Sequence, residues 1–97
     1  MLSKEQVIKR LEKKFPNISG ICDGGPMGYG PESVLLGDAA EGGTINDFPA
    51  CNYYGWESDP KENIWIMGVH KDLYKELGDM GWYAECYDPG TFIAYPV

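Results

Sequence analysis

The sequence predicts one α+β domain over residues 1–97, a mainly antiparallel sheet of four or five short strands with two helices on one face. Three observations predict it. Two segments have the apolar spacing of amphipathic helices, the C-terminal segment alternates like a β-hairpin, and 13 glycines with 7 prolines indicate many turns. The order helix, strand, turn and strand occurs at 3–36 and again at 70–95, a weak argument for a repeated layout.

The first predicted helix runs from Ser3 to about Lys14. Ser3 caps it while Gln6 reaches back, which is the capping-box spacing. Pro16 then stops the helix. One apolar stripe is formed by Val7, Ile8, Leu11 and Phe15.

The middle of the chain holds two short apolar runs, 18–22 and 33–36, which are suited to pair as strands. Between them lies the glycine-rich segment Gly24–Gly30. A phosphate-binding loop needs a lysine after its last glycine, or a dinucleotide fingerprint that leads into a helix. Because Gly30 is followed by Pro31 and no cation is near, we interpret this segment as a mobile surface loop, with a gating or partner-contact loop as the alternative.

The last third of the chain is the easiest to interpret. Residues 64–69 form an apolar run, which is typical of a strand covered on both faces. We therefore expect Trp65 and Ile66 to be buried in a central strand. A helix follows over His70–Met80, and its buried side is predicted to consist of Leu73, Leu77 and Met80.

Residues 82–87 and 92–95 form a predicted hairpin around the turn Asp88–Thr91. A four-residue turn sets Tyr87 opposite Phe92. One face is then apolar and consists of Trp82, Ala84, Cys86, Ile93, Tyr95 and Val97. The other face is mixed and consists of Tyr83, Glu85, Tyr87, Phe92 and Ala94. An antiparallel sheet that is backed by helices needs one dry face of this kind.

The formal net charge is −7, and its distribution excludes some partners. Residues 15–60 contain seven carboxylates and no lysine or arginine, so they cannot form the basic groove that phosphate backbones need. We therefore expect neither nucleic acid nor a membrane as a partner. An acidic mimic of nucleic acid is a further alternative, although a charge of −7 on 97 residues is moderate.

Two features indicate a cytoplasmic protein. The N-terminal residues alternate charged and apolar side chains, unlike a signal peptide, and no apolar run approaches the roughly 18 residues of a membrane span. The three cysteines are widely spaced and odd in number, which favours reduced thiols over a disulfide framework: Cys22, Cys51 and Cys86.

His70 is the only histidine and the only candidate general base of the usual kind. Nothing in the sequence pairs it with a nucleophile, and a helix-capping or surface role is favoured. A small enzyme or ligand-binding domain centred on His70 with Asp23, Asp38 or Asp88 is the rival interpretation. We expect no metal and no cofactor, because calcium-loop spacing is absent from the carboxylates considered, which are Asp23, Asp38, Glu41, Asp47 and Asp88.

Aromatic residues make up 13% of the chain, more than two faces of so small a domain can bury, so some are expected at the surface. The mixed face of the hairpin makes Tyr83, Tyr87 and Phe92 the candidate self-interface. The leading interpretation is a small, acidic, non-enzymatic protein-binding module. Its simplest partner is a second copy of itself, which makes a homodimer.

The closing pattern Gly81–Thr91, followed by Tyr95 and Pro96, resembles small uncharacterised proteins of phages and environmental bacteria. The segment Gly68–Lys71 fits the same resemblance. The likeness covers about the last third of the chain and implies no activity. It favours an accessory protein of a phage or another mobile element.

Overall fold

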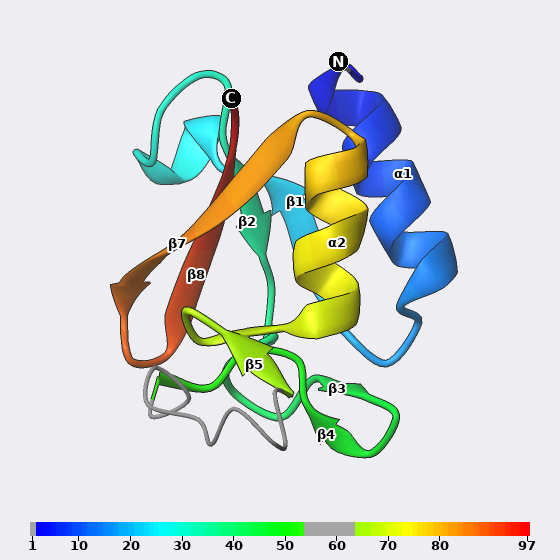
Figure 1. The fold of residues 1–97 in the computed structure, drawn as a ribbon. Helices are drawn as coiled ribbons and strands as arrows, with labels where there is room; N and C mark the ends of the chain where they lie inside the picture. The colour runs from blue at the N-terminus through cyan, green and yellow to red at the C-terminus, as the bar shows by residue number, and fades with distance from the viewer. Residues whose placement is uncertain (1, 54–63) are drawn as a thin grey trace.

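The computed structural model describes residues 2–53 and 64–97 (Figure 1). Its helical elements are α1 (Lys4–Lys14), the short 3₁₀ turn η1 (Gly25–Met27) and α2 (Lys71–Asp79). Its strands are β1 (Ile21–Asp23), β2 (Val34–Leu36), β3 (Thr44–Ile45), β4 (Phe48–Pro49), β5 (Trp65–Ile66), β6 (Val69–His70), β7 (Trp82–Asp88) and β8 (Thr91–Pro96). No described helix is long and apolar enough to cross a membrane.

Four strands form one antiparallel sheet in the order β1-β2-β8-β7, and α1 and α2 lie side by side against one of its faces (Figure 1). The predicted α+β class is confirmed, including the four-stranded sheet and the two helices. β1 and β2 pair as expected, with Ile21 opposite Leu36. Two further sheets have two strands each, β3 with β4 and β5 with β6.

The main sheet joins two similar units. α1 precedes the β1–β2 hairpin, α2 precedes the β7–β8 hairpin, and each helix contacts the first strand of its own hairpin. The hairpins meet through β2 and β8, where Val34 lies opposite Ala94 and Leu35 lies opposite Ile93. The order that recurs in the sequence therefore also recurs in space.

Both helices have the ends that the sequence predicts. In α1 the Ser3 hydroxyl accepts a hydrogen bond from the Gln6 backbone N–H at 3.4 Å, and Gln6 Oε1 accepts one from the Ser3 N–H at 2.9 Å. The capping box is therefore confirmed. α2 ends before Gly81, whose φ of +80° is the left-handed conformation that terminates helices.

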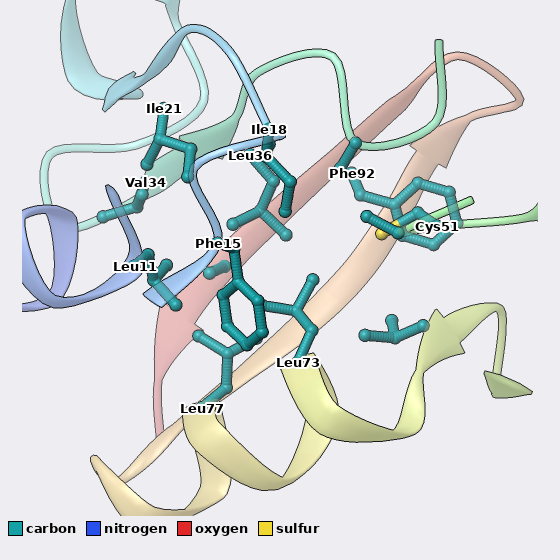
Figure 2. Close-up of a cluster of buried hydrophobic side chains, with 14 of the residues drawn as sticks. Leu11, Phe15, Ile18, Ile21, Val34, Leu36, Cys51, Leu73, Leu77 and Phe92 are labelled. Carbon is teal, nitrogen blue, oxygen red and sulfur yellow. The ribbon is translucent and has the colours of Figure 1, made fainter. Parts of the chain in front are cut away.

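The core lies between the helices and the sheet, and Figure 2 shows side chains from both layers pointing toward one another. α1 contributes Leu11, which is fully buried, and α2 contributes Leu73 and Leu77. The predicted stripe of Leu73, Leu77 and Met80 is confirmed. The sheet contributes Ile21, Val34, Leu36, Phe92 and Ala94.

The prediction of a buried central strand over residues 64–69 is wrong. A turn splits this run into β5 and β6, because Met67 and Gly68 both have positive φ, +52° and +83°. Such a pair is typical of a tight hairpin turn of type I′. Ile66 is 39% exposed and Trp65 is half-buried, so β5 lies at the surface, whereas Val69 of β6 is buried, and the two strands form a small separate sheet.

The predicted register of the last hairpin is wrong by one residue. Asp88 pairs with Thr91, and a bulge between Cys86 and Asp88 leaves Tyr87 as the extra residue, so Cys86 rather than Tyr87 lies opposite Phe92. A shift of one residue exchanges the two faces of a strand. Phe92 therefore lies in the core, only 1% exposed, and the expectation that it is a surface residue is wrong.

Candidate functional site

His70 caps the N-terminus of α2. Its Nδ1 accepts a hydrogen bond from the backbone N–H of Asp72 at 3.1 Å, and its own backbone N–H donates to the carbonyl of Ala50 at 2.8 Å. The residue is only 2% exposed, and burial lowers the pKa of its imidazole, which favours the neutral form. The imidazole has the geometry of a helix cap.

The three aspartates that the sequence offered as partners of His70 bind nearby backbone N–H groups instead. Asp23, Asp38 and Asp88 each accept a hydrogen bond from a backbone N–H, at 2.8, 2.8 and 3.0 Å respectively. Asp23 also pairs with Lys4 at 2.9 Å, and the Lys4 ammonium holds the pKa of that carboxyl below its usual range. Within residues 2–53 and 64–97, no three histidine, cysteine or carboxylate side chains gather as metal ligands.

The three cysteines are free thiols. Burial raises the pKa of Cys51, and burial together with the charge of Asp88 raises the pKa of Cys86. The thiolate is the nucleophilic form of cysteine, so these two environments work against nucleophilic chemistry.

The two helices share an ionic cluster that the sequence reasoning missed. The Glu76 side chain is 5% exposed, and its two oxygens accept bonds from Arg10 Nε at 2.5 Å and Lys14 Nζ at 2.6 Å. These cations hold the pKa of Glu76 below its usual range. A signal was present in the sequence, because Glu76 falls on the same helical stripe as Leu73 and Leu77.

The sheet face opposite the helices carries a cluster of four tyrosines, which we name the tyrosine face. Tyr29 and Tyr87 meet edge to face with ring centroids 4.9 Å apart, and Tyr83 and Tyr95 lie 5.8 Å apart at 34°. Tyr87 is 64% exposed and Tyr83 is 40% exposed. Two of the three candidate interface residues thus lie here, whereas Phe92 points to the core.

A groove runs beside the tyrosine face. One part, about 390 Å³, lies between residues 30–33 and the rings of Tyr83 and Tyr95. A neighbouring hollow of about 510 Å³ continues it toward Leu2 and Trp82. The two hollows have Pro31, Glu32 and Pro96 in common and therefore adjoin, and we call the two together the groove.

Residues 30–33, at the end of the glycine-rich segment, form one wall of this groove and are tied to the rest of the fold. The Ser33 hydroxyl and backbone N–H both donate to the carbonyl of Gly30, at 2.8 and 3.2 Å. Lys4 Nζ donates to the carbonyl of Pro31 at 2.8 Å, and a side chain on Gly24 would collide with the Ser33 hydroxyl. These contacts within the chain itself hold the wall in place.

The groove has an acidic border. Glu32 lines both hollows, and Glu85 is close enough to Tyr95 that its charge, added to the larger effect of burial, raises the pKa of the Tyr95 phenol. In the part of the chain that the structure describes, neither Glu32 nor Glu85 forms an ion pair. Lys4 also lines the second hollow, but it is paired with Asp23, so the groove combines aromatic walls with two carboxylates that form no ion pair among the described residues.

A second group of exposed apolar side chains, Phe48, Ile66 and Met67, lies on β4 and the β5–β6 turn. Residues 54–63, which precede β5 in the sequence, lie outside the described residues. We therefore take the tyrosine face, whose residues are all described, as the candidate site. No family model, curated protein sequence or solved structure matches this chain. The site is therefore interpreted from its own chemistry.

Proposed function

We propose that this chain is a small, non-enzymatic protein-binding module that uses the tyrosine face as its contact surface. The observation that supports this best is the difference between the two faces of the sheet. The helices bury one face, whereas the other leaves Tyr83 and Tyr87 exposed at 40% and 64%. Tyrosine offers rigid apolar area with a polar hydroxyl, and it is enriched at protein interfaces.

A second copy of the chain is the simplest partner. Copies with a net charge of −7 repel each other, most strongly at low salt, so apolar contact must supply the attraction. A closed two-fold dimer places the tyrosine face against itself. Self-association should then strengthen or hold as salt is added, because salt screens only the repulsion.

The surroundings of the reactive groups favour binding over catalysis. His70 is engaged as a helix cap, and the thiol of Cys51 is buried with a raised pKa. The free thiols are in keeping with a reducing compartment, and we propose a cytoplasmic protein.

Analytical ultracentrifugation across a salt series, from about 0.02 M to about 0.5 M, tests the proposal. The parent is compared with Tyr87→Asp and with Met67→Asp, which is the control because Met67 is similarly exposed at 58% but lies off the tyrosine face. We expect only Tyr87→Asp to be monomeric. A parent that is monomeric at every salt concentration, or a dimer that survives Tyr87→Asp, contradicts self-association through this face. Phe92→Asp is unsuitable, because it places a charge in the core.

A further inference from the structure

We infer that the groove beside the tyrosine face binds a proline-rich polypeptide segment that carries a basic residue. This inference rests on the proposed function and adds a partner other than a second copy, which would compete with self-association because Tyr83 and Tyr95 of the tyrosine face line the groove. It depends on three properties of the groove, which are its preformed walls, the engaged backbone carbonyls of Gly30 and Pro31 and its acidic border.

The walls are preformed. Tyr83 and Tyr95 already pack against each other across β7 and β8, and the opposite wall is tied by Ser33 and Lys4. A preformed site binds without the entropic cost of ordering its own side chains. An extended ligand of about eight residues in the polyproline II conformation is roughly 25 Å long and would reach from one hollow past Pro96 into the other.

The backbone of the wall at residues 30–33 has few groups to offer. Pro31 has no N–H and its carbonyl already accepts from Lys4, while the carbonyl of Gly30 accepts two bonds from Ser33. Pro96 on the other side also lacks an N–H. A ligand that must pair its backbone, as an added β-strand does, finds no free carbonyl at Gly30 or Pro31 and no N–H at Pro31 or Pro96. Polyproline II keeps its backbone solvated and docks in aromatic-lined grooves by its rings.

The acidic border selects the charge of the ligand. Glu32 lies where the two hollows meet, and Glu85 lies beside the tyrosines. Neither carboxylate has a cationic partner among the residues that the structure describes. A basic residue in the ligand supplies that partner, whereas an acidic one is repelled.

Three synthetic peptides of equal length test the inference on the parent protein by NMR titration of backbone amides. The first is polyproline with one terminal arginine, the second has glutamate in place of the arginine, and the third has alanines in place of the prolines but keeps the arginine. We expect the first to give saturable shifts at residues 32, 33, 83 and 95. The second should bind at least about tenfold more weakly, and the third should not saturate.

Matched variants place the binding in the groove. Tyr83→Ala and Glu32→Gln should each weaken binding of the first peptide several-fold. Phe48→Ala, at 42% exposure, and Glu12→Gln, on the exposed side of α1, should leave it unchanged. Tyr83→Phe, which keeps the ring, should retain binding, and this separates loss of the site from loss of the fold.

Several outcomes overturn the inference. Equal binding of the alanine peptide would show plain charge attraction, and shifts confined to amides along the outer edge of β7 would show strand addition instead. No binding by any peptide also refutes it. The proposed function fails separately, because self-association through Tyr87 is measured without peptide.

Discussion

Glu76 Oε2 accepts a hydrogen bond from Lys14 Nζ at 2.6 Å across the interface of the two helices. Arg10 binds the other oxygen of the same carboxylate. The carboxylate is almost fully buried, whereas the side chains of Arg10 and Lys14 are 46% and 54% exposed. The cluster thus holds one buried anion between two cations that still contact water.

Glu76→Gln should lower the free energy of unfolding by about 1–3 kcal/mol near neutral pH, because two charge-assisted hydrogen bonds become neutral ones. The pKa of Glu76 is lowered in the folded state, so this stabilisation is present above the pKa of the unfolded chain and is lost as the pH falls through the folded value. Urea denaturation at neutral pH and at about pH 3 should show the difference between variant and parent shrinking in acid. Asp79→Asn, at an exposed ion pair with Lys75, is the control and should change little.

The stability should also depend on His70 at mildly acidic pH. Burial lowers the imidazole pKa in the folded state, partly offset by Asp72, so the unfolded chain binds the proton more readily. Stability is therefore complete above the unfolded pKa of about 6.5 and falls as the pH drops below it. Denaturation between about pH 7.5 and about pH 5.5 measures the effect, and His70→Asn, which caps without titrating, should flatten the profile. An unchanged slope in His70→Asn would show that another group is responsible.

Leu73→Ala and Leu77→Ala should each lower the free energy of unfolding by about 2–4 kcal/mol, since both side chains are almost fully buried against the sheet. Tyr74→Ala on the same helix should cost less than about 1 kcal/mol, because Tyr74 is 43% exposed. Chemical denaturation of the three variants checks the contrast. Losses below about 1 kcal/mol at the leucines would contradict this account of the core.

Replacing each of two glycines by alanine should change the free energy of unfolding in opposite directions. Gly37 has a φ of +58°, and a Cβ there would lie 1.9 Å from the Ser19 carbonyl oxygen, so Gly37→Ala should cost roughly 2 kcal/mol or more. Gly78 lies in α2 with open space around it, so Gly78→Ala should add about 0.5–1 kcal/mol. Thermal unfolding of both variants against the parent tests the pair, and two changes of the same sign would contradict it.

The sequence predicted those parts of the fold whose determinants are local. The capping box of Ser3 and Gln6 and the stripe around Leu73 depend on spacing within one helix, and both were predicted correctly. The predicted register of the β7–β8 hairpin was wrong by one residue, because the alternation of apolar side chains does not reveal the bulge at Tyr87. That one residue decided whether Phe92 or Ile93 faced the helices.

The candidate site was only partly predictable for the same reason. Tyr83 and Tyr87 were identified from the hairpin itself. The groove was not, because its other wall comes from residues 30–33, some fifty positions earlier in the chain. The cations that neutralise Glu76 are more than sixty residues away, and only the tertiary fold brings them together.

The place of β8 in the sheet affects how the chain must fold. β8 lies between β2 and β7, so the strand that follows all the others along the chain is the one that joins the two hairpins. Its pairing of Val34 with Ala94 closes a loop of about sixty residues, which is a slow step because chain entropy is lost before contacts are gained. During synthesis, β2 therefore lacks its second neighbour in the sheet until β8 has emerged from the ribosome.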